Sequence, residues 1–185
     1  MVLITLVCAA LGCHRADRIV VGAKNFTESD ILAEIAAQQI ERRTGLAVDR
    51  KLHLGGTFVC HAAITAGQID LYVEYSGTAF TAVLKHEAGP GADSVYRVVA
   101  DEYRSRWGII WLKPFGFDNT FAIAVRQADA TRYGLHTISD LARMAPQWHA
   151  GFGYEFLNRA DGFPGLAAAY GLRFASPPNA MERRS

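Results

Sequence analysis

The side chains that catalysis commonly uses do not form a catalytic pattern in this sequence. It has no GxxxxGK phosphate loop, no HExxH zinc motif, no GxSxG nucleophile elbow and no GxGxxG run after a strand. His53, Cys60 and His61 stand close together, which would suit a metal or a thiol nucleophile. Because adjacent residues on a helix face different directions, we interpret these three as packing and surface residues. The sequence therefore predicts a protein that is not an enzyme and that uses no metal or cofactor.

Three charged residues could hold an ionic ligand instead. Lys24 stands just before the first expected helix, where its charge and a helix amino terminus can act on one anion; the alternative is a solvated surface lysine. Arg159 could bind an anion too, or it could pair with Asp161 at the surface at little net energy. Glu74 could balance a bound cation, or it could hydrogen-bond the turn at residues 76–78. The residues by themselves leave both interpretations open.

Strand and helix patterns alternate through the first part of the chain. Short apolar strands are expected at residues 18–22, 46–54 and 69–75, with a helix between each pair. A capping-box sequence at residues 27–30 predicts the start of the first helix, and Gly45 predicts its end. This order of strands and helices is typical of a parallel sheet covered by helices. Further helices are expected after Gly77 and over residues 94–107.

A second unit is expected to begin near residue 114. It contains a predicted strand at residues 120–125 (TFAIAV) and a capping box at residues 137–140 that opens a short helix. Pro164 and Gly171 mark the start and the end of a last helix. The predicted fold class is therefore α/β in two parts.

Composition excludes several classes of protein. The chain has 185 residues, 50% of them hydrophobic, so it is neither disordered nor collagen-like. Its 19 basic and 18 acidic residues leave a net charge of +1, which provides no electrostatic reason to expect nucleic acid. Cys8, Cys13 and Cys60 have neither the even count of a disulfide framework nor the spacing of a zinc site. We expect a globular protein that is not stabilised by disulfides.

The amino terminus resembles an export signal. Residues 1–13 carry no charge, and their apolar run is shorter than the roughly 20 residues that span a bilayer. The run ends in Leu11-Gly12-Cys13, as in a bacterial lipoprotein cleavage site, so Cys13 is predicted to become the lipidated first residue. The alternative is a buried amino-terminal strand. Export would place the protein in the periplasm or on the outer face of the cytoplasmic membrane, with residues 1–17 as leader and linker.

Five segments between residues 21 and 166 show a family resemblance. In order, they are VGAKNFTES, KLHLGGT, GQIDLYVEYSGTA, KPFGFDNTFAIAV and EFLNRADGFPGL. Together they resemble the osmoprotectant substrate-binding proteins of ABC importers, over residues 18–181. The resemblance implies a periplasmic-binding-protein-like (type II) two-lobed fold, with lobe one at residues 18–114 and lobe two at residues 115–185. It also implies that the chain binds glycine betaine, proline betaine, choline or carnitine and delivers it to a permease and its ATPase.

The resemblance also implies which residues touch the ligand. A quaternary ammonium group is bulky, cationic and unable to donate N–H hydrogen bonds, so aromatic faces hold it at about 0.5–2 kcal/mol per contact. Tyr75 and Phe121 match the family's aromatic cage, although the family usually has tyrosine where this chain has Phe121. Lys24, Thr78 and Arg159 match the positions that hold the carboxylate of glycine betaine. The alternative places both aromatic residues in the core.

Members of the family extend beyond the segment that ends at residue 181. They supply further cage aromatics there and return to complete lobe one, so the resemblance implies that the carboxyl-terminal part of the fold is missing here. Three interpretations follow: a monomeric binding component of an importer, a sensor or enzyme on the same scaffold, or a truncated product without function. The export signal, the cage residues and the lack of enzyme motifs favour the first over the second.

Overall fold

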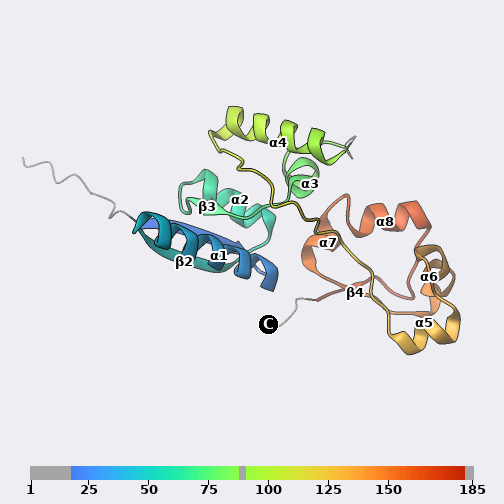
Figure 1. The fold of residues 1–185 in the computed structure, drawn as a ribbon. Coiled ribbons are helices and arrows are strands. Elements are labelled where there is room, and N and C mark those ends of the chain that lie inside the picture. Colours follow the sequence, from blue (N-terminus) through green and yellow to red (C-terminus); the bar gives the residue numbers. More distant parts are fainter. Residues whose placement is uncertain (1–17, 88–90, 182–185) are drawn as a thin grey trace, which may run out of the picture.

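The computed structural model describes residues 18–87 and 91–181 of the chain. The expected leader, including Cys13, lies outside the described residues. Figure 1 shows the described elements in two groups joined by residues 108–126, the extended segment. The first group contains β1 (Arg18–Lys24), α1 (Thr27–Thr44), β2 (Ala47–Gly55), α2 (Thr57–Thr65), β3 (Leu71–Tyr72), α3 (Ser76–Thr78), a π-helical turn (Ala79–Val83) and α4 (Ala92–Trp107).

The second group follows the extended segment. It contains α5 (Gln127–Tyr133), α6 (Ile138–Met144), a 3₁₀ turn (Ala145–Gln147), β4 (Gly151–Phe152), α7 (Tyr154–Asn158), α8 (Phe163–Tyr170) and β5 (Asn179–Ala180). Leu141, Ala145 and Leu172 form the buried core of this group. Strands β4 and β5 pair in parallel, although they are far apart in the chain.

The first group contains a parallel sheet in the order β2-β1-β3. The predicted alternation of strands and helices is confirmed, but β3 covers only Leu71–Tyr72 of the expected 69–75. The central strand β1 has five consecutive buried residues, 20–24, as expected for a strand covered on both faces. The sheet thus buries the end of β1, where Lys24 lies.

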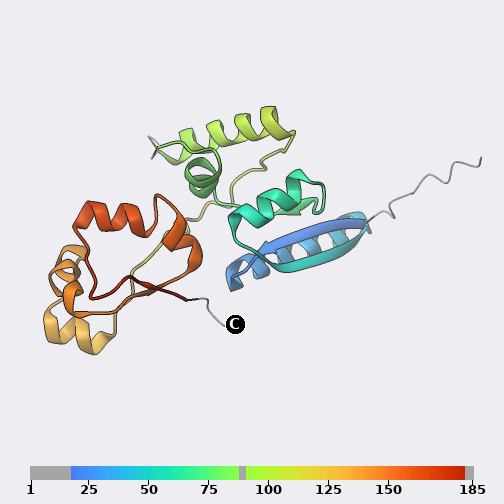
Figure 2. The ribbon, with the colours of Figure 1, turned by 180° about the vertical axis from the view of Figure 1, so that it is seen from behind.

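Helices α1 and α2 cover opposite faces of this sheet, as Figure 2 shows from behind. Val21 packs in the same cluster as Ala33 and Ala37 of α1. Its neighbour Val20 packs with Ala63 of α2, because successive residues of a strand point to opposite faces. The sheet is therefore sandwiched between two helices, and the start of each helix lies near the carboxyl end of β1.

One of the two predicted capping boxes is confirmed. At α6, Thr137 Oγ1 accepts the Asp140 N–H at 3.1 Å, and the Asp140 carboxylate accepts the Thr137 N–H at 2.9 Å. The box expected at residues 27–30 is wrong, since the N-cap of α1 is Phe26 and makes no side-chain cap bond. Ser29 Oγ instead accepts the backbone N–H of Lys24 at 2.8 Å. The serine ties the end of β1 to α1.

The strand predicted at residues 120–125 is also wrong. These residues are extended but belong to no strand, and Phe121 remains 51% exposed. An alternating apolar sequence becomes a strand only where a neighbour accepts its backbone hydrogen bonds, and no such pairing occurs in the described part of the chain. Among residues 18–87 and 91–181, no helix has both the length and the apolar character needed to cross a bilayer.

Candidate functional site

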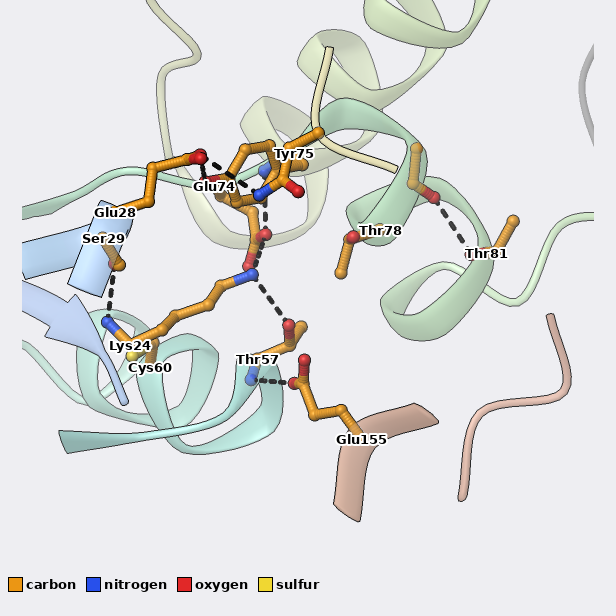
Figure 3. Close-up of polar contacts among 12 residues, drawn as sticks. Lys24, Glu28, Ser29, Thr57, Cys60, Glu74, Tyr75, Thr78, Thr81 and Glu155 are labelled. Carbon is orange, nitrogen blue, oxygen red and sulfur yellow. Dashed lines mark hydrogen bonds and ion pairs between the residues drawn. The ribbon is translucent and has the colours of Figure 1, made fainter. Parts of the chain in front are cut away.

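Lys24 is buried at the carboxyl end of β1 and is only 2% exposed, so the surface interpretation of this lysine is wrong. Its Nζ donates a hydrogen bond to Thr57 Oγ1 at 2.9 Å and forms an ion pair with the Glu74 carboxylate, as Figure 3 shows. Strand β1 and the start of α2 bring these groups together. The ammonium group of Lys24 is therefore already paired with a carboxylate of the chain.

Glu74 is the buried partner of Lys24, with a side chain 4% exposed. One oxygen, Oε1, also accepts the Tyr75 backbone N–H at 2.8 Å, whereas Oε2 has no partner among the described residues. Burial raises the pKa of Glu74, and the Lys24 charge opposes that shift. Of the open interpretations, the structure supports a hydrogen bond to the backbone before the turn, and the charge that Glu74 balances is that of Lys24.

Tyr75 lies directly before α3 and is partly buried. Its ring stacks on Phe26 with 6.3 Å between centroids, and Lys24 Nζ lies 5.1 Å from the Tyr75 centroid. The phenol donates to Glu28, as Figure 3 shows. Oε1 of Glu28 also accepts from Asn119 Nδ2 at 3.1 Å. Burial and the bond to Glu28 raise the pKa of Tyr75. The tyrosine contributes an oriented aromatic face.

Arg159 lies at the end of α7 and is 8% exposed. Its guanidinium binds Asp161 through Nε at 2.9 Å and through a terminal nitrogen at 2.6 Å, and it donates to Thr78 Oγ1 at 3.0 Å. Burial opposes the charged form, but the hydrogen bond and charge of Asp161, together with the charges of Glu155 and Glu74, leave the pKa of Arg159 raised. Arg159 does pair with Asp161, as one interpretation expected, but it does so as a buried residue that reaches α3.

Phe121 is the site residue that comes from the extended segment. The Arg159 guanidinium carbon lies 5.4 Å from the Phe121 ring centroid, and the Phe121 ring contacts Phe156 at 4.7 Å between centroids. With half of its surface exposed, Phe121 is not a core residue.

The five residues expected at the site form two clusters. Lys24 and Tyr75 make one cluster, and Thr78, Phe121 and Arg159 make the other. Tyr75 and Thr78 stand at opposite ends of the single turn α3, which joins the clusters. A ligand touching both would contact residues from β1, α3, α7 and the extended segment.

Sequence reasoning missed Glu155, whose bond to Thr57 links the two groups of elements. Glu155 of α7 accepts the backbone N–H of Thr57, the first residue of α2, across 98 positions in the chain. A Cβ at Gly56 would lie 2.7 Å from Glu155 Oε1, so a larger residue there would make the Glu155 carboxylate shift. The Gly-Gly-Thr run before α2 was a usable signal of close backbone approach. Glu155 begins the resemblance segment EFLNRADGFPGL, but its residue type and position gave no indication of the contact with Thr57.

Cys60 and His61, which were considered for metal or thiol chemistry, are packed inside the first group of elements. Burial raises the pKa of Cys60 to about 11, so its thiol stays protonated near neutrality. The ring of His61 packs against Tyr103 and Trp107, and burial lowers its pKa. No group of three or more His, Cys, Asp or Glu residues in the described ranges could hold a metal ion.

An open apolar hollow on α2, lined by residues such as Phe58, contains none of the site residues.

Comparison with known proteins relates this geometry to a family. Residues 17–183 match the family described as the substrate binding domain of ABC-type glycine betaine transport systems. The glycine-betaine-binding protein of Pseudomonas aeruginosa is 35% identical over 181 residues, covering 91% of this chain and 57% of that protein. The ergothioneine transport permease/ergothioneine binding protein EgtU of Helicobacter pylori is 33% identical over 159 residues, covering 85% of this chain and 28% of that protein.

A solved structure shows the same fold. The crystal structure of a glycine betaine/carnitine/choline ABC transporter matches with a TM-score of 0.62 and 25% identity, over 89% of this chain and 61% of that chain. The chain therefore spans less than two thirds of the length of each of these proteins. The α/β fold is that of periplasmic substrate-binding proteins, as the sequence predicted. The chain belongs to the family of substrate-binding domains of ABC-type glycine betaine transport systems.

Proposed function

We propose that this chain is the ligand-capturing component of an ABC importer and that its ligand is a quaternary amine such as glycine betaine, proline betaine, choline or carnitine. It binds the amine and delivers it to a permease, and it catalyses no reaction. The family match supports the transport role. The observation that carries the ligand class is a pair of aromatic side chains near the two ends of α3. Tyr75 lies beside the buried Lys24, and Phe121 lies beside the buried Arg159, which bonds Thr78 of α3. Aromatic faces are the surfaces that attract a quaternary ammonium group.

The two groups of elements in Figure 1 act, in this proposal, as two lobes at residues 18–114 and 115–185 that close on the ligand. The bond between Glu155 and Thr57 and the bond between Arg159 and Thr78 join these groups. Both bonds lie beside the candidate ligand residues. Closure would bring Phe121 and Arg159 toward Tyr75 and Lys24.

Delivery to a permease requires that the protein work outside the cytoplasm. We propose a location in the periplasm or on the outer face of the membrane, with Cys13 as the lipid-modified residue. The apolar run that ends in Leu11-Gly12-Cys13 supports this location. Diacylation at Cys13 would provide a stable anchor, since a single chain binds membranes only weakly.

Calorimetry tests the ligand class. Glycine betaine, proline betaine, choline, carnitine and ergothioneine are titrated into the purified chain, and into the chain extended by the remaining carboxyl-terminal part of the Pseudomonas aeruginosa relative. We expect saturable binding of at least one trimethylated or dimethylated quaternary amine. Glycine, which has the carboxylate without the methyl groups, is the matched control and should not compete. Binding of none of the amines by either protein would contradict the proposal.

A further inference from the structure

Glu28, in the first turn of α1, holds the hydroxyl of the candidate ligand residue Tyr75. The Tyr75 phenol donates to the Glu28 carboxylate, as Figure 3 shows, although the two residues are 47 positions apart. Asn119 of the extended segment donates through Nδ2 to the same oxygen of Glu28 at 3.1 Å, across 91 positions. One side-chain oxygen therefore joins α1, the residue before α3 and the extended segment.

The first turn of α1 restricts the Tyr75 ring in two complementary ways. The hydroxyl lies on the long axis of the ring, so its bond to Glu28 fixes the direction in which the side chain points. The ring of Phe26, the N-cap residue of α1, stacks on Tyr75 with 6.3 Å between centroids and so restricts how the ring plane is turned. At the other end of the residue, the Tyr75 backbone N–H is bonded to Glu74 at 2.8 Å. Tyr75 is thus held at its backbone, its ring face and its hydroxyl.

The turn that carries Phe26 and Glu28 is itself anchored to the sheet. Ser29, the next residue of α1, is 1% exposed, and its Oγ accepts the backbone N–H of Lys24 at 2.8 Å. Lys24 is the last residue of the central strand β1. A contact made from this turn can therefore orient a neighbour, because the turn is tied to the buried end of β1.

The bond to Asn119 extends the same support to the second candidate aromatic residue. Phe121 follows Asn119 by two positions, a stretch that even a fully extended chain spans in about 7 Å. The extended segment belongs to no sheet in the described part of the chain, so the Glu28 bond supplies a tie that strand pairing does not. Glu28 thus holds Tyr75 and the backbone next to Phe121 in a fixed relation.

We propose that Glu28 is a positioning residue of the ligand site, which orders Tyr75 and the segment bearing Phe121 before a quaternary ammonium group arrives. Groups that are already ordered raise affinity, because binding does not have to order them. The inference rests on the proposed function for its ligand. The ordering of Tyr75 and Asn119 is a property of the ligand-free chain and can be measured without any amine.

Two variants separate positioning from the effects of charge. A carboxylate in the first turn of a helix also favours the helix dipole, and its charge attracts a cation at long range. Glu28→Asp keeps the charge but is one methylene shorter, so it withdraws the carboxylate from Tyr75 and Asn119. Glu28→Gln loses the charge but keeps the length and an acceptor oxygen. Positioning predicts that the glutamine variant resembles the wild type and that the aspartate variant does not.

Calorimetry with choline and with glycine betaine provides the first measurement, on the chain and on its extended form. Glu28→Asp should weaken binding about three- to tenfold, the range expected when a side chain must be ordered during binding. In the Tyr75→Phe background the same change should weaken binding less, because only the tie to Asn119 is left to lose. Glu34→Gln, which alters another carboxylate of α1 that pairs with Arg50, is the matched control and should bind as the wild type does.

NMR on the ligand-free chain provides the second measurement. With ¹³C-labelled tyrosine, the Tyr75 ring should be more mobile in Glu28→Asp than in the wild type and unchanged in Glu28→Gln. The side-chain amide signal of Asn119 should move in the aspartate variant. If neither signal responds, Glu28 orders neither partner and the inference is overturned, whether or not any amine binds.

Three calorimetric results would also overturn the inference. Wild-type affinity in Glu28→Asp would show that the reach of the side chain is unimportant. Equal losses in Glu28→Asp with and without the Tyr75 hydroxyl would show that Glu28 does not act through Tyr75. Weak binding by Glu28→Gln with normal binding by Glu28→Asp would assign the effect to charge. The proposed function fails separately, through lack of amine binding by the wild type, and the NMR measurement still decides whether Glu28 orders the site.

Discussion

Tyr75 is the residue from which the proposed ligand class can be tested most directly. Tyr75→Ala removes an aromatic face and should weaken amine binding by about 1–2 kcal/mol. Tyr75→Phe is the matched control, because it keeps the ring and loses only the hydrogen bond to Glu28. Calorimetry on the two variants separates the ring from the hydroxyl. Equal affinities for wild type and Tyr75→Ala would remove Tyr75 from the site.

Lys24 and Glu74 test whether the buried pair is structural. Lys24→Met leaves the Glu74 carboxylate buried without its cation, so the free energy of unfolding should fall by about 3–5 kcal/mol. The double variant Lys24→Met/Glu74→Leu removes both charges and should lose less than the sum of the two single variants. Urea unfolding gives all the values. An unchanged stability in Lys24→Met would show that the pair contributes nothing to the fold.

At the scale of elements, the capping box of α6 predicts a pH dependence. Hydrogen bonds from the His136 and Thr137 backbone and from the Thr137 hydroxyl lower the pKa of Asp140 to about 2. A carboxylate whose pKa is lower in the folded state stabilises that state above its unfolded pKa, and it loses this effect as pH falls toward the folded value. The melting temperature should therefore decrease between about pH 4 and pH 2, and less steeply in Asp140→Asn. Identical slopes would contradict this role for the box.

At the scale of the whole molecule, the exposed apolar side chains of the extended segment predict how a longer chain would change association, stability and binding. Exposed apolar residues gather there, including Ile110, Leu112, Phe115 and Phe121, and uncovered apolar surface favours association. We expect the purified chain to bind amines weakly and to associate. Extending it by the remaining part of the Pseudomonas aeruginosa relative should raise the melting temperature, the monomer fraction and the amine affinity. A monomeric, cooperatively melting chain with unchanged properties after extension would refute this expectation.

The membrane anchor is tested on the whole precursor. Radiolabelled palmitate should enter the wild-type product expressed in a bacterium and should not enter Cys13→Ala. Cys60→Ala is the matched control. Cys60 is buried and is not a lipidation site, so this variant, which keeps Cys13, should be labelled as the wild type is. Labelling of neither wild type nor control would indicate a cleaved signal without lipid.

Local sequence patterns predicted most of the elements. Apolar strands 18–22 and 46–54, the ending of α1 at Gly45 and the capping box of α6 were all confirmed, since each depends on residues close in the chain. The family resemblance identified the fold, because five ordered motifs rarely coincide by chance. It also pointed to the residues that meet around α3, although their role as ligand contacts is still a prediction.

Tertiary structure alone decided the rest. Residues 120–125 have a strand pattern and form no strand, because pairing needs a neighbour that sequence alternation does not supply. Lys24 was also consistent with a surface charge until burial against Thr57 and Glu74 gave it partners from distant segments. Glu155 begins one of the resemblance segments, but nothing in the sequence indicated its bond to Thr57, which spans 98 positions. Sequence by itself determined the local elements and the family, and long-range contacts decided which charges are paired, because burial and pairing depend on which distant segments meet.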